Sequence, residues 1–475
     1  MAKIKSPLRF SRHFGIKPEL MQKLGVFDPI LEADTPLFID PVLVTHSSAI
    51  EISSDGFKRM EEYFSDLYRL ILASKREGDA AWSTARKYLQ FHEVPGTCLG
   101  YGGGSIHGSG WGPQLTSELL TRANEIIKAG VDDHRIFLLI GLFSEGIGPD
   151  RLSDMSTNIM LPDIATYTER ICNTLEIELD IFKIEGSEYF LPRNPLQIKA
   201  TPILLLPRDI LRDLPVAFSV EEIWEAAAHN EALRIGIHKK IGVLWEKANK
   251  EQKGEVLQAL LKDPEYAHKL IDRLTKIKVD EYDQVRDERG HLIWADLAYD
   301  IASTFPKSIA PVAVCSTGEL NRVVVEIIKQ FKFLMEQRDL WRVLNDSDSR
   351  KTEKTAQRIF FAVAFAYCIA NNLDITPEAD TGNGPIDFKF SGGFHSKILV
   401  ELKLSKNDVL RGHNVQLPIY IKAERADYAH YVVINVGHLG QKWQTLQAER
   451  KANKQSEPAI WLIDAEPRES ASTRS

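Results

Sequence analysis

Three charged side chains, Asp387, Glu401 and Lys403, stand inside two runs of residues that otherwise have the composition of buried strands. Two carboxylates can bind a divalent cation through oxygen, and a nearby ammonium group can stabilise negative charge that develops in a reaction. The three side chains therefore indicate metal-dependent chemistry, provided that they meet on one surface. The alternative is an ordinary half-exposed hairpin whose polar side chains face water.

The spacing of the apolar residues predicts that the two runs are strands. In KILVELKL the apolar residues fall at every second position, which places Glu401 and Lys403 together on the opposite face. In GPIDFKF, Asp387 and Lys389 alternate with apolar residues in the same way. The two glycines of the connecting SGGFHS suit a tight reversal. A hairpin of these strands would bring Asp387 within a side chain's reach of Glu401.

The composition is that of a globular protein. The chain has 475 residues, of which 44% are hydrophobic and 26% charged, and this length suits two large domains or three of average size. It contains no apolar run long enough to predict a membrane span. The basic N-terminal segment lacks the apolar core of a secretory signal. The four cysteines show no metal-binding spacing, so we expect a cytoplasmic protein without a disulfide framework or structural zinc.

The charge of the chain limits what kind of surface could bind a polyanion such as nucleic acid. The net charge is −7, and residues 345–475 carry nearly equal numbers of basic and acidic side chains. A uniformly basic surface is therefore excluded. A phosphate-binding surface would have to be a local groove.

Changes in pattern divide the chain into four parts. Residues 1–235 form a mixed region, predicted as α+β, in which the β-like segments PLFIDPVLV, HRIFLLIGLF and PILLLP alternate with helical stretches. Residues 236–344 are predicted to be a helical connector that ends in a long helix over 318–344. The polar stretch NDSDSRK marks the start of a C-terminal domain over residues 345–465. Residues 466–475 have the composition of a disordered tail.

The C-terminal domain is predicted to be α/β. After the polar stretch, the periodicity predicts the order α-β-β-β-α-β-α-β. An antiparallel meander followed by strand–helix–strand units makes a mixed sheet flanked by helices.

The motif residues of this domain resemble the PD-(D/E)XK nuclease superfamily. Asp387 on one strand and the tripeptide ELK that begins at Glu401 on the next strand match its motif. Gln416 and Tyr420 share a face of the following helix and resemble the Q-x-x-x-Y arrangement of the RecB-type branch. The segment PEADTGNGPIDFKFSGG is similar to nuclease domains of bacterial phage-defence proteins. The resemblance covers roughly residues 350–465 and implies a restriction-endonuclease-like fold.

The resemblance also implies the chemistry of the site. Asp387, Glu401 and the backbone carbonyl of Leu402 would bind Mg²⁺, with Mn²⁺ as an alternative, and Lys403 would lie beside the attacking water. Glu353, on the helix before the first strand, is a candidate for an additional metal ligand. Its alternative is a solvated helix residue.

Four further residues are candidates for contact with the substrate. Gln416 and Tyr420 would line the site or contact the phosphate backbone, and helix packing is their alternative. Lys389 and Lys406 would contact phosphates, although charged surface residues are usually only solvated. His413 is not expected to be a ligand.

These expectations together describe a metal-dependent endodeoxyribonuclease in antiviral defence. DNA would be its partner, and the N-terminal region would act as sensor or regulator. Partner defence proteins and a homo-oligomer stay open. The sequence leaves two other readings: a nuclease that acts on RNA or branched DNA, and a non-catalytic nucleic-acid-binding or assembly subunit.

The N-terminal region offers weaker candidates. The loop GYGGGSIHGSGWG (100–112) precedes a predicted helix but matches neither nucleotide-binding glycine motif. The turn-rich segment IGPDRLSDMSTN (147–158) would form a ligand loop or a capped helix start. Asp34 and Asp40 flank a short strand, where turn chemistry explains them. None of these is assigned a catalytic role.

Overall fold

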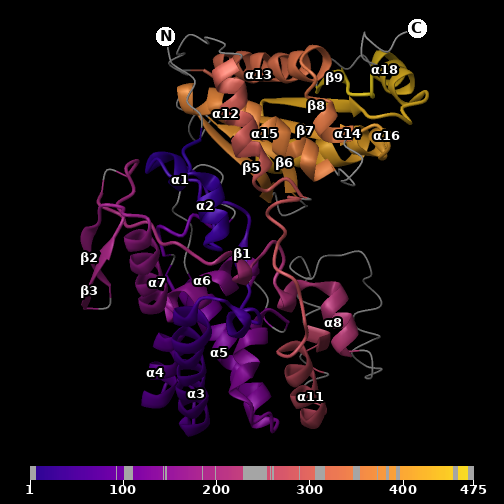
Figure 1. Ribbon diagram of the computed structural model, residues 1–475. Helices are drawn as coiled ribbons and strands as arrows, with labels where there is room; N and C mark the ends of the chain where they lie inside the picture. Colours follow the sequence, from indigo (N-terminus) through magenta and orange to yellow (C-terminus); the bar gives the residue numbers. More distant parts are fainter. Residues whose placement is uncertain are drawn as a thin grey trace. The chain divides into compact units, whose positions relative to one another are not determined.

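The computed structural model divides the chain into two compact units, Leu8–Tyr282 and Asp283–Ser475, and the second also takes in Met1–Pro7 (Figure 1). The structure describes residues 7–468 apart from 93, 101–110, 143, 145–146, 185, 198, 228–253, 257, 259–261, 288, 305–315, 346–352, 372, 381–384, 392–395 and 453–457. The side chains of residues 220, 221, 226, 227, 370, 371, 378–380 and 385 also lie outside this description.

Several predicted features fall partly or wholly outside the described residues. These are most of the glycine-rich loop (101–110), the turn between the two motif strands (392–395), the polar stretch (346–351), part of the helical connector (236–253) and the end of the predicted tail (469–475).

The first unit is mainly helical in its described residues. Its α-helices are α1 (Phe10–His13), α2 (Pro18–Lys23), α3 (Phe57–Ala73), α4 (Ala80–Tyr88), α5 (Pro113–Lys128), α6 (Pro149–Ile159), α7 (Leu161–Thr174), α8 (Val220–Ala227) and α11 (Pro264–Leu274). Shorter helical segments are η1 (Val44–His46), the π-helix η2 (Glu51–Gly56), η3 (His134–Leu142), η4 (Arg208–Ile210) and η5 (Val216–Phe218). Strand β1 (Phe38–Ile39) pairs antiparallel with β4 (Leu211–Arg212), and β2 (Asp180–Ile184) pairs antiparallel with β3 (Ser187–Leu191).

The strand predicted in HRIFLLIGLF is wrong, because residues 134–142 form the 3₁₀ segment η3. Every residue from Ile136 to Leu142 is buried, so the run is apolar on all sides and carries no period that separates a strand from a buried helix. Gly141 lies directly against the ring of Phe218, where a Cβ atom would collide with the ring. The apolar run therefore serves as a core segment of the first unit.

The C-terminal unit contains one mixed sheet, and the predicted order of its elements is confirmed. Helix α15 (Glu353–Asn371) precedes β5 (Asp374–Asp380), β6 (Pro385–Ser391) and β7 (Lys397–Leu404). Helices α16 (Val409–Arg411) and α17 (Leu417–Glu424), joined by the π-helix η7 (Gly412–Gln416), lead to β8 (Tyr428–Asn435), α18 (Lys442–Ala452) and β9 (Ala459–Asp464). The strands lie in the order β5-β6-β7-β8-β9. The first three are antiparallel, and β7, β8 and β9 are parallel.

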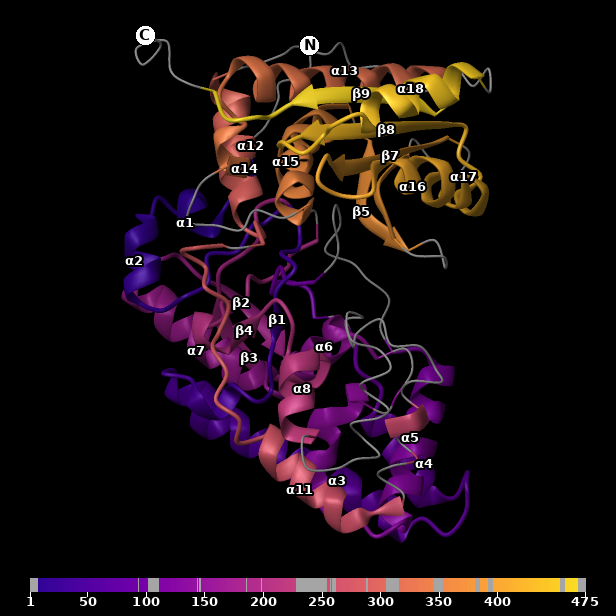
Figure 2. The same ribbon diagram turned by 90° about the vertical axis from the view of Figure 1, so that its right-hand side faces the viewer.

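Helices cover both faces of this sheet (Figure 2). On one face, α15 packs through Phe360 and Phe361 against Phe388 of β6, with ring centroids 5.0 and 6.4 Å apart. Helix α12 (Ile293–Thr304) covers the outer side of α15 through Trp294, which explains why α15 is apolar all round. On the other face, α16, α17 and α18 enclose a core that includes Leu399.

The sheet also depends on residues before the predicted domain start at 345. Helix α13 (Thr317–Gln337) packs on β6, β7 and β9, and it belongs to the compact unit that begins at Asp283. The predicted helix over 318–344 is in fact two helices, α13 and α14 (Arg342–Asn345). Asp339 between them has φ 58°, a left-handed conformation that stops a helix. No helix in the described ranges is long and apolar enough to cross a membrane.

Candidate active site

The predicted hairpin of β6 and β7 is confirmed, and Asp387 and Glu401 lie where its pairing ends. The last paired residues are Phe388 and Val400, so Asp387 and Glu401 would form the next opposed pair. In place of a backbone oxygen, Oδ2 of Asp387 accepts the hydrogen bond of the Leu402 backbone N–H at 2.7 Å. The Asp387 carboxylate therefore enters the space between the two strands.

Both carboxylates are buried, and burial raises the pKa of each. Asp387 is 8% exposed and Glu401 3% exposed. Burial, followed by the charges of Glu401 and Glu353, raises the pKa of Asp387 well above its usual range. Burial raises the pKa of Glu401 to about 7, although Lys403 and the Asp387 backbone N–H act in the opposite direction. Two adjacent acids of this kind need a positive charge to be fully ionised at neutral pH.

Lys403 supplies one positive charge to this cluster. Its Nζ lies 3.1 Å from Oε1 of Glu353 and 3.6 Å from Oε1 of Glu401. Burial alone would lower the pKa of Lys403, but the carboxylates of Glu353, Glu401 and Asp387 outweigh it and raise that pKa. The side chain therefore stays an ammonium at neutral pH. It is suited to stabilising negative charge rather than to removing a proton.

Glu353 lies at the first turn of α15, and its carboxylate is already engaged. One oxygen contacts Lys403, and the other accepts hydrogen bonds from the Leu404 backbone N–H and the Asn407 side chain. In the described part of the chain, no group of three or more histidine, cysteine, aspartate or glutamate side chains is placed to hold a metal ion. Glu353 thus holds the lysine in this structure.

The remaining donors nevertheless fit a magnesium ion. Mg²⁺ usually keeps several waters and takes only one or two protein carboxylates together with substrate phosphates. Asp387 and Glu401 provide that number of carboxylates. Oε2 of Glu401 is buried and finds no hydrogen-bond partner among the described residues. A buried acceptor without a donor, beside a second acid, is suited to a cation.

Tyr420 lies within the electrostatic influence of the two carboxylates. Burial raises the pKa of the Tyr420 hydroxyl, and the charges of Glu401 and Asp387 raise it further. The half-buried Gln416 stands at the N-terminus of α17, and no hydrogen bond joins its side chain to either carboxylate. The pKa of Tyr420 therefore depends on the two acids of the site.

The two lysines predicted to contact phosphates lie in different surroundings. Lys389 on β6 forms an ion pair of 3.5 Å with Glu424 of α17, which also pairs with Lys397 at 3.1 Å. Lys406 is exposed in the segment that follows β7. His413, which was not expected to be a ligand, is buried and hydrogen-bonds with the Asn414 side chain.

Two residues that support the site escaped the sequence analysis. Gln357, one helical turn after Glu353 on α15, donates a hydrogen bond from Nε2 to Oδ1 of Asp387 at 2.6 Å. Its spacing from Glu353 was the only available signal, because residues four apart share a face of a helix. Asn407 holds Glu353, and nothing in its local sequence marked that contact.

Gly412 leaves space beside Lys403, and a methyl group there is expected to destabilise the unit. Its backbone is helical, but a Cβ atom would collide with the hydroxyl of Tyr431 and lie 3.5 Å from Cε of Lys403. That hydroxyl donates to the Val409 carbonyl at 2.8 Å. We expect Gly412→Ala to lower the free energy of unfolding by about 2 kcal/mol in denaturant titrations.

The control for this prediction is Gly318→Ala on α13, where a Cβ atom meets nothing within 4 Å. Alanine should leave stability unchanged or raise it there, because it favours a helix. Removing the Tyr431 hydroxyl in Gly412→Ala/Tyr431→Phe should restore part of the loss. Equal stability of the two single glycine variants would contradict the steric explanation.

The N-terminal candidates lie in the first unit. A Cβ atom on Gly100 would lie 2.9 Å from Oδ1 of Asp150 and 3.8 Å from Oδ2 of Asp34, so the two acids approach the start of the glycine-rich loop. Asp40 is fully buried, and it accepts hydrogen bonds from two backbone N–H groups and pairs with Arg212 at 3.6 Å. Asp40 therefore fastens the segments around β1 and β4.

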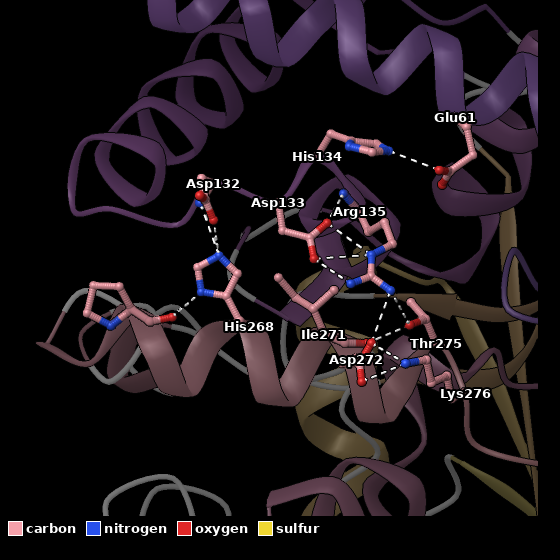
Figure 3. Close-up of polar contacts among 11 residues, drawn as sticks. Glu61, Asp132, Asp133, His134, Arg135, His268, Ile271, Asp272, Thr275 and Lys276 are labelled. Atoms are coloured by element: carbon pink, nitrogen blue, oxygen red, sulfur yellow. Dashed lines mark hydrogen bonds and ion pairs between the residues drawn. The ribbon is translucent and has the colours of Figure 1, made fainter.

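The first unit also has an open groove of about 470 Å³ beside α3. Its lining residues are Glu61, Glu62, Ser65, Asp66, Arg69 and His134. Nε2 of His134 lies 3.1 Å from Oε2 of Glu61 (Figure 3). Next to it, Arg135 hydrogen-bonds with Asp133 and with Asp272 of α11, which attaches this helix to the start of η3. These contacts join η3 to α3 and to α11.

The contact between His134 and Glu61 predicts a measurable shift of a histidine pKa. The hydrogen bond with Glu61 raises the pKa of His134, while burial acts in the opposite direction. A raised pKa in the folded state means that the stabilisation is present below pH ~6.5 and is lost as the pH rises through the folded pKa. Both side chains are about one-third exposed, so this contribution stays below about 1 kcal/mol. An NMR titration should give a pKa above 6.5 that falls in Glu61→Gln. An identical His134 pKa in both proteins would contradict the role of Glu61.

Two family models match parts of the chain, and both describe domains of unknown function. DUF8370 matches residues 15–219, and DUF8371 matches residues 320–438. The first match lies within the first compact unit, and the second spans the candidate site from Glu353 to Tyr420. No curated protein and no solved structure matches the chain.

Proposed function

We propose that the C-terminal unit is a Mg²⁺-dependent nuclease, an endonuclease that hydrolyses phosphodiester bonds of DNA. The observation that carries this proposal is the buried pair Asp387 and Glu401 beside the ammonium of Lys403, at the point where β6 and β7 stop pairing. Two repelling carboxylates with an unpaired oxygen are costly unless a cation joins them. Together with the order of helices and strands, this supports a restriction-endonuclease-like fold of the PD-(D/E)XK type.

The residues of the site divide the work of hydrolysis. Bound Mg²⁺ would supply a Lewis acid and a water of lowered pKa. Asp387, Glu401 and the Leu402 carbonyl would hold the cation. Lys403, which stays charged, would stabilise the negative charge that develops on the phosphate. The Tyr420 hydroxyl, close to both acids, would hydrogen-bond to a phosphate oxygen.

The first unit would then act as sensor or regulator of the nuclease in anti-phage defence, in the cytoplasm and with or without partner proteins. This part of the proposal rests on the similarity of the segment around Asp387 to phage-defence nucleases. It also follows from the danger of an uncontrolled nuclease to its host.

A cleavage assay tests the proposal. Supercoiled DNA, linear duplex DNA, single-stranded DNA and RNA would each be incubated with the full chain in Mg²⁺, Mn²⁺ or EDTA. We expect nicking or cutting of duplex DNA with either metal and none in EDTA. Metal-dependent cleavage of RNA alone would make the protein a ribonuclease. Binding of nucleic acid without turnover under any condition would refute the nuclease and favour a non-catalytic module.

A further inference from the structure

Gln357 of α15 contacts one of the two carboxylates, that of Asp387, directly. Its side chain is buried, and its Nε2 donates to Oδ1 of Asp387 at 2.6 Å. The other oxygen of Asp387 accepts the Leu402 backbone N–H. The two hydrogen bonds come from a helix and from the neighbouring strand, so together they fix the plane of the Asp387 carboxylate.

The other end of the Gln357 amide has no such partner. Its Oε1 is buried and finds no hydrogen-bond donor among the described residues, as is also the case for Oε2 of Glu401. A buried acceptor of this kind destabilises the folded chain unless a donor reaches it. Two such oxygens beside Asp387 give the site an excess of acceptors over donors. A hydrated divalent cation balances that excess, because it attracts oxygen and its waters donate hydrogen bonds.

Helix α15 holds the Gln357 side chain in a fixed position relative to the sheet. Glu353 and Gln357 are four residues apart and so share one face, from which the first contacts Lys403 and the second contacts Asp387. The helix is anchored to β6 by Phe360 and Phe361, which pack on Phe388, the residue next to Asp387. The helix and the motif strand therefore keep a fixed relation at this position.

We propose that Gln357 is a positioning residue for the cation: Nε2 orients the Asp387 carboxylate, and Oε1 accepts a hydrogen bond from a water of the cation's hydration shell. The proposal rests on the proposed function, since it assumes that Asp387 and Glu401 bind a divalent ion. In this proposal α15 contributes to cation binding in addition to the motif strands β6 and β7.

The test is the affinity of the full chain for Mn²⁺ alone, measured by calorimetry without substrate. Gln357→Met keeps the length of the side chain and removes both polar atoms. We expect it to bind Mn²⁺ about 10- to 100-fold more weakly than the wild type, the usual loss when a residue that orients a metal ligand is removed. Gln357→Glu keeps an oxygen at this position but loses the Nε2 donor, so it should bind Mn²⁺ more tightly than Gln357→Met.

The matched control is Gln330→Met on α13, a glutamine of similar burial on a helix that covers the same sheet. It should retain wild-type affinity, and circular dichroism would show that all three variants are folded. Wild-type affinity in Gln357→Met would overturn the inference while the proposed function stands. A loss in Gln357→Glu as large as in Gln357→Met would overturn the role of Oε1. Absence of Mn²⁺ binding in the wild type itself would instead refute the proposed metal site.

Discussion

Cleavage of DNA by the Lys403→Met variant is expected to fall about 10²- to 10³-fold, the usual effect of removing one preorganised group that stabilises a transition-state charge. Methionine matches the length of the lysine stem but carries no charge. The carboxylates of Glu353, Glu401 and Asp387 keep the lysine protonated, so its contribution is electrostatic. The loss should appear in the single-turnover rate with saturating enzyme. DNA binding should change less, because the ammonium lies beside the carboxylates and is partly buried.

Lys397→Met is the matched control for this variant. Lys397 lies at the opposite end of the same strand, and it pairs with Glu424 rather than with the candidate metal ligands. Its variant should cleave at nearly the wild-type rate. An equal loss in both variants would show that the effect comes from general damage to β7. Full activity of Lys403→Met would show that the lysine takes no part in the reaction. It would also contradict the assignment of the nuclease motif.

The elements around this site follow from local patterns in the sequence. Alternation with a period of two identifies β6 and β7, and the pleat then decides that Glu401 and Lys403 share a face. The order of helices and strands from α15 to β9 follows from the same periodicities. Secondary structure and the facing of strand residues depend mainly on residues that are close in the chain, so they can be predicted from the sequence.

The contacts that tune the site depend instead on packing between distant segments. The pairing of Lys403 with Glu353 and the hydrogen bond from Gln357 to Asp387 join α15 to the strands across many residues. No local rule selects these partners over other polar residues of the same helix. The buried segment 134–142 shows the related difficulty, because a run that is apolar on every side has no period to identify it.

In the metal-free protein, the contribution of Glu401 to the stability of the C-terminal unit is expected to fall as the pH rises from about 4.5 to about 7. Burial lowers the pKa of His430 to about 4 and also lowers that of His413, so these two histidines act in the opposite direction over much of this range. The pKa of Glu401 rises from 4.5 in the unfolded chain to about 7 in the folded one, mainly through burial. A raised acid pKa means that the folded state binds the proton more tightly, so stability is lost as the pH passes through this window. The loss amounts to about 3 kcal/mol for Glu401, and the raised pKa of Asp387 adds to it in the same direction. Urea titrations in EDTA at several pH values, of the wild type and of Glu401→Gln, would isolate it, because His430 and His413 contribute equally to both proteins.

Two variants with opposite expected signs make this prediction specific. Glu401→Gln removes a buried negative charge, so in EDTA above pH 7 it should be more stable than the wild type, and Mg²⁺ should no longer stabilise it. Glu424→Gln should be less stable than the wild type at the same pH. Burial acts to raise the pKa of Glu424, but Lys397 and Lys389 lower it overall, so its charge stabilises the fold. If both substitutions destabilised the metal-free protein, Glu401 would be an ordinary paired acid. If Glu401 destabilises the metal-free fold and a bound cation reverses this effect, cation binding explains why an acid is buried at this position.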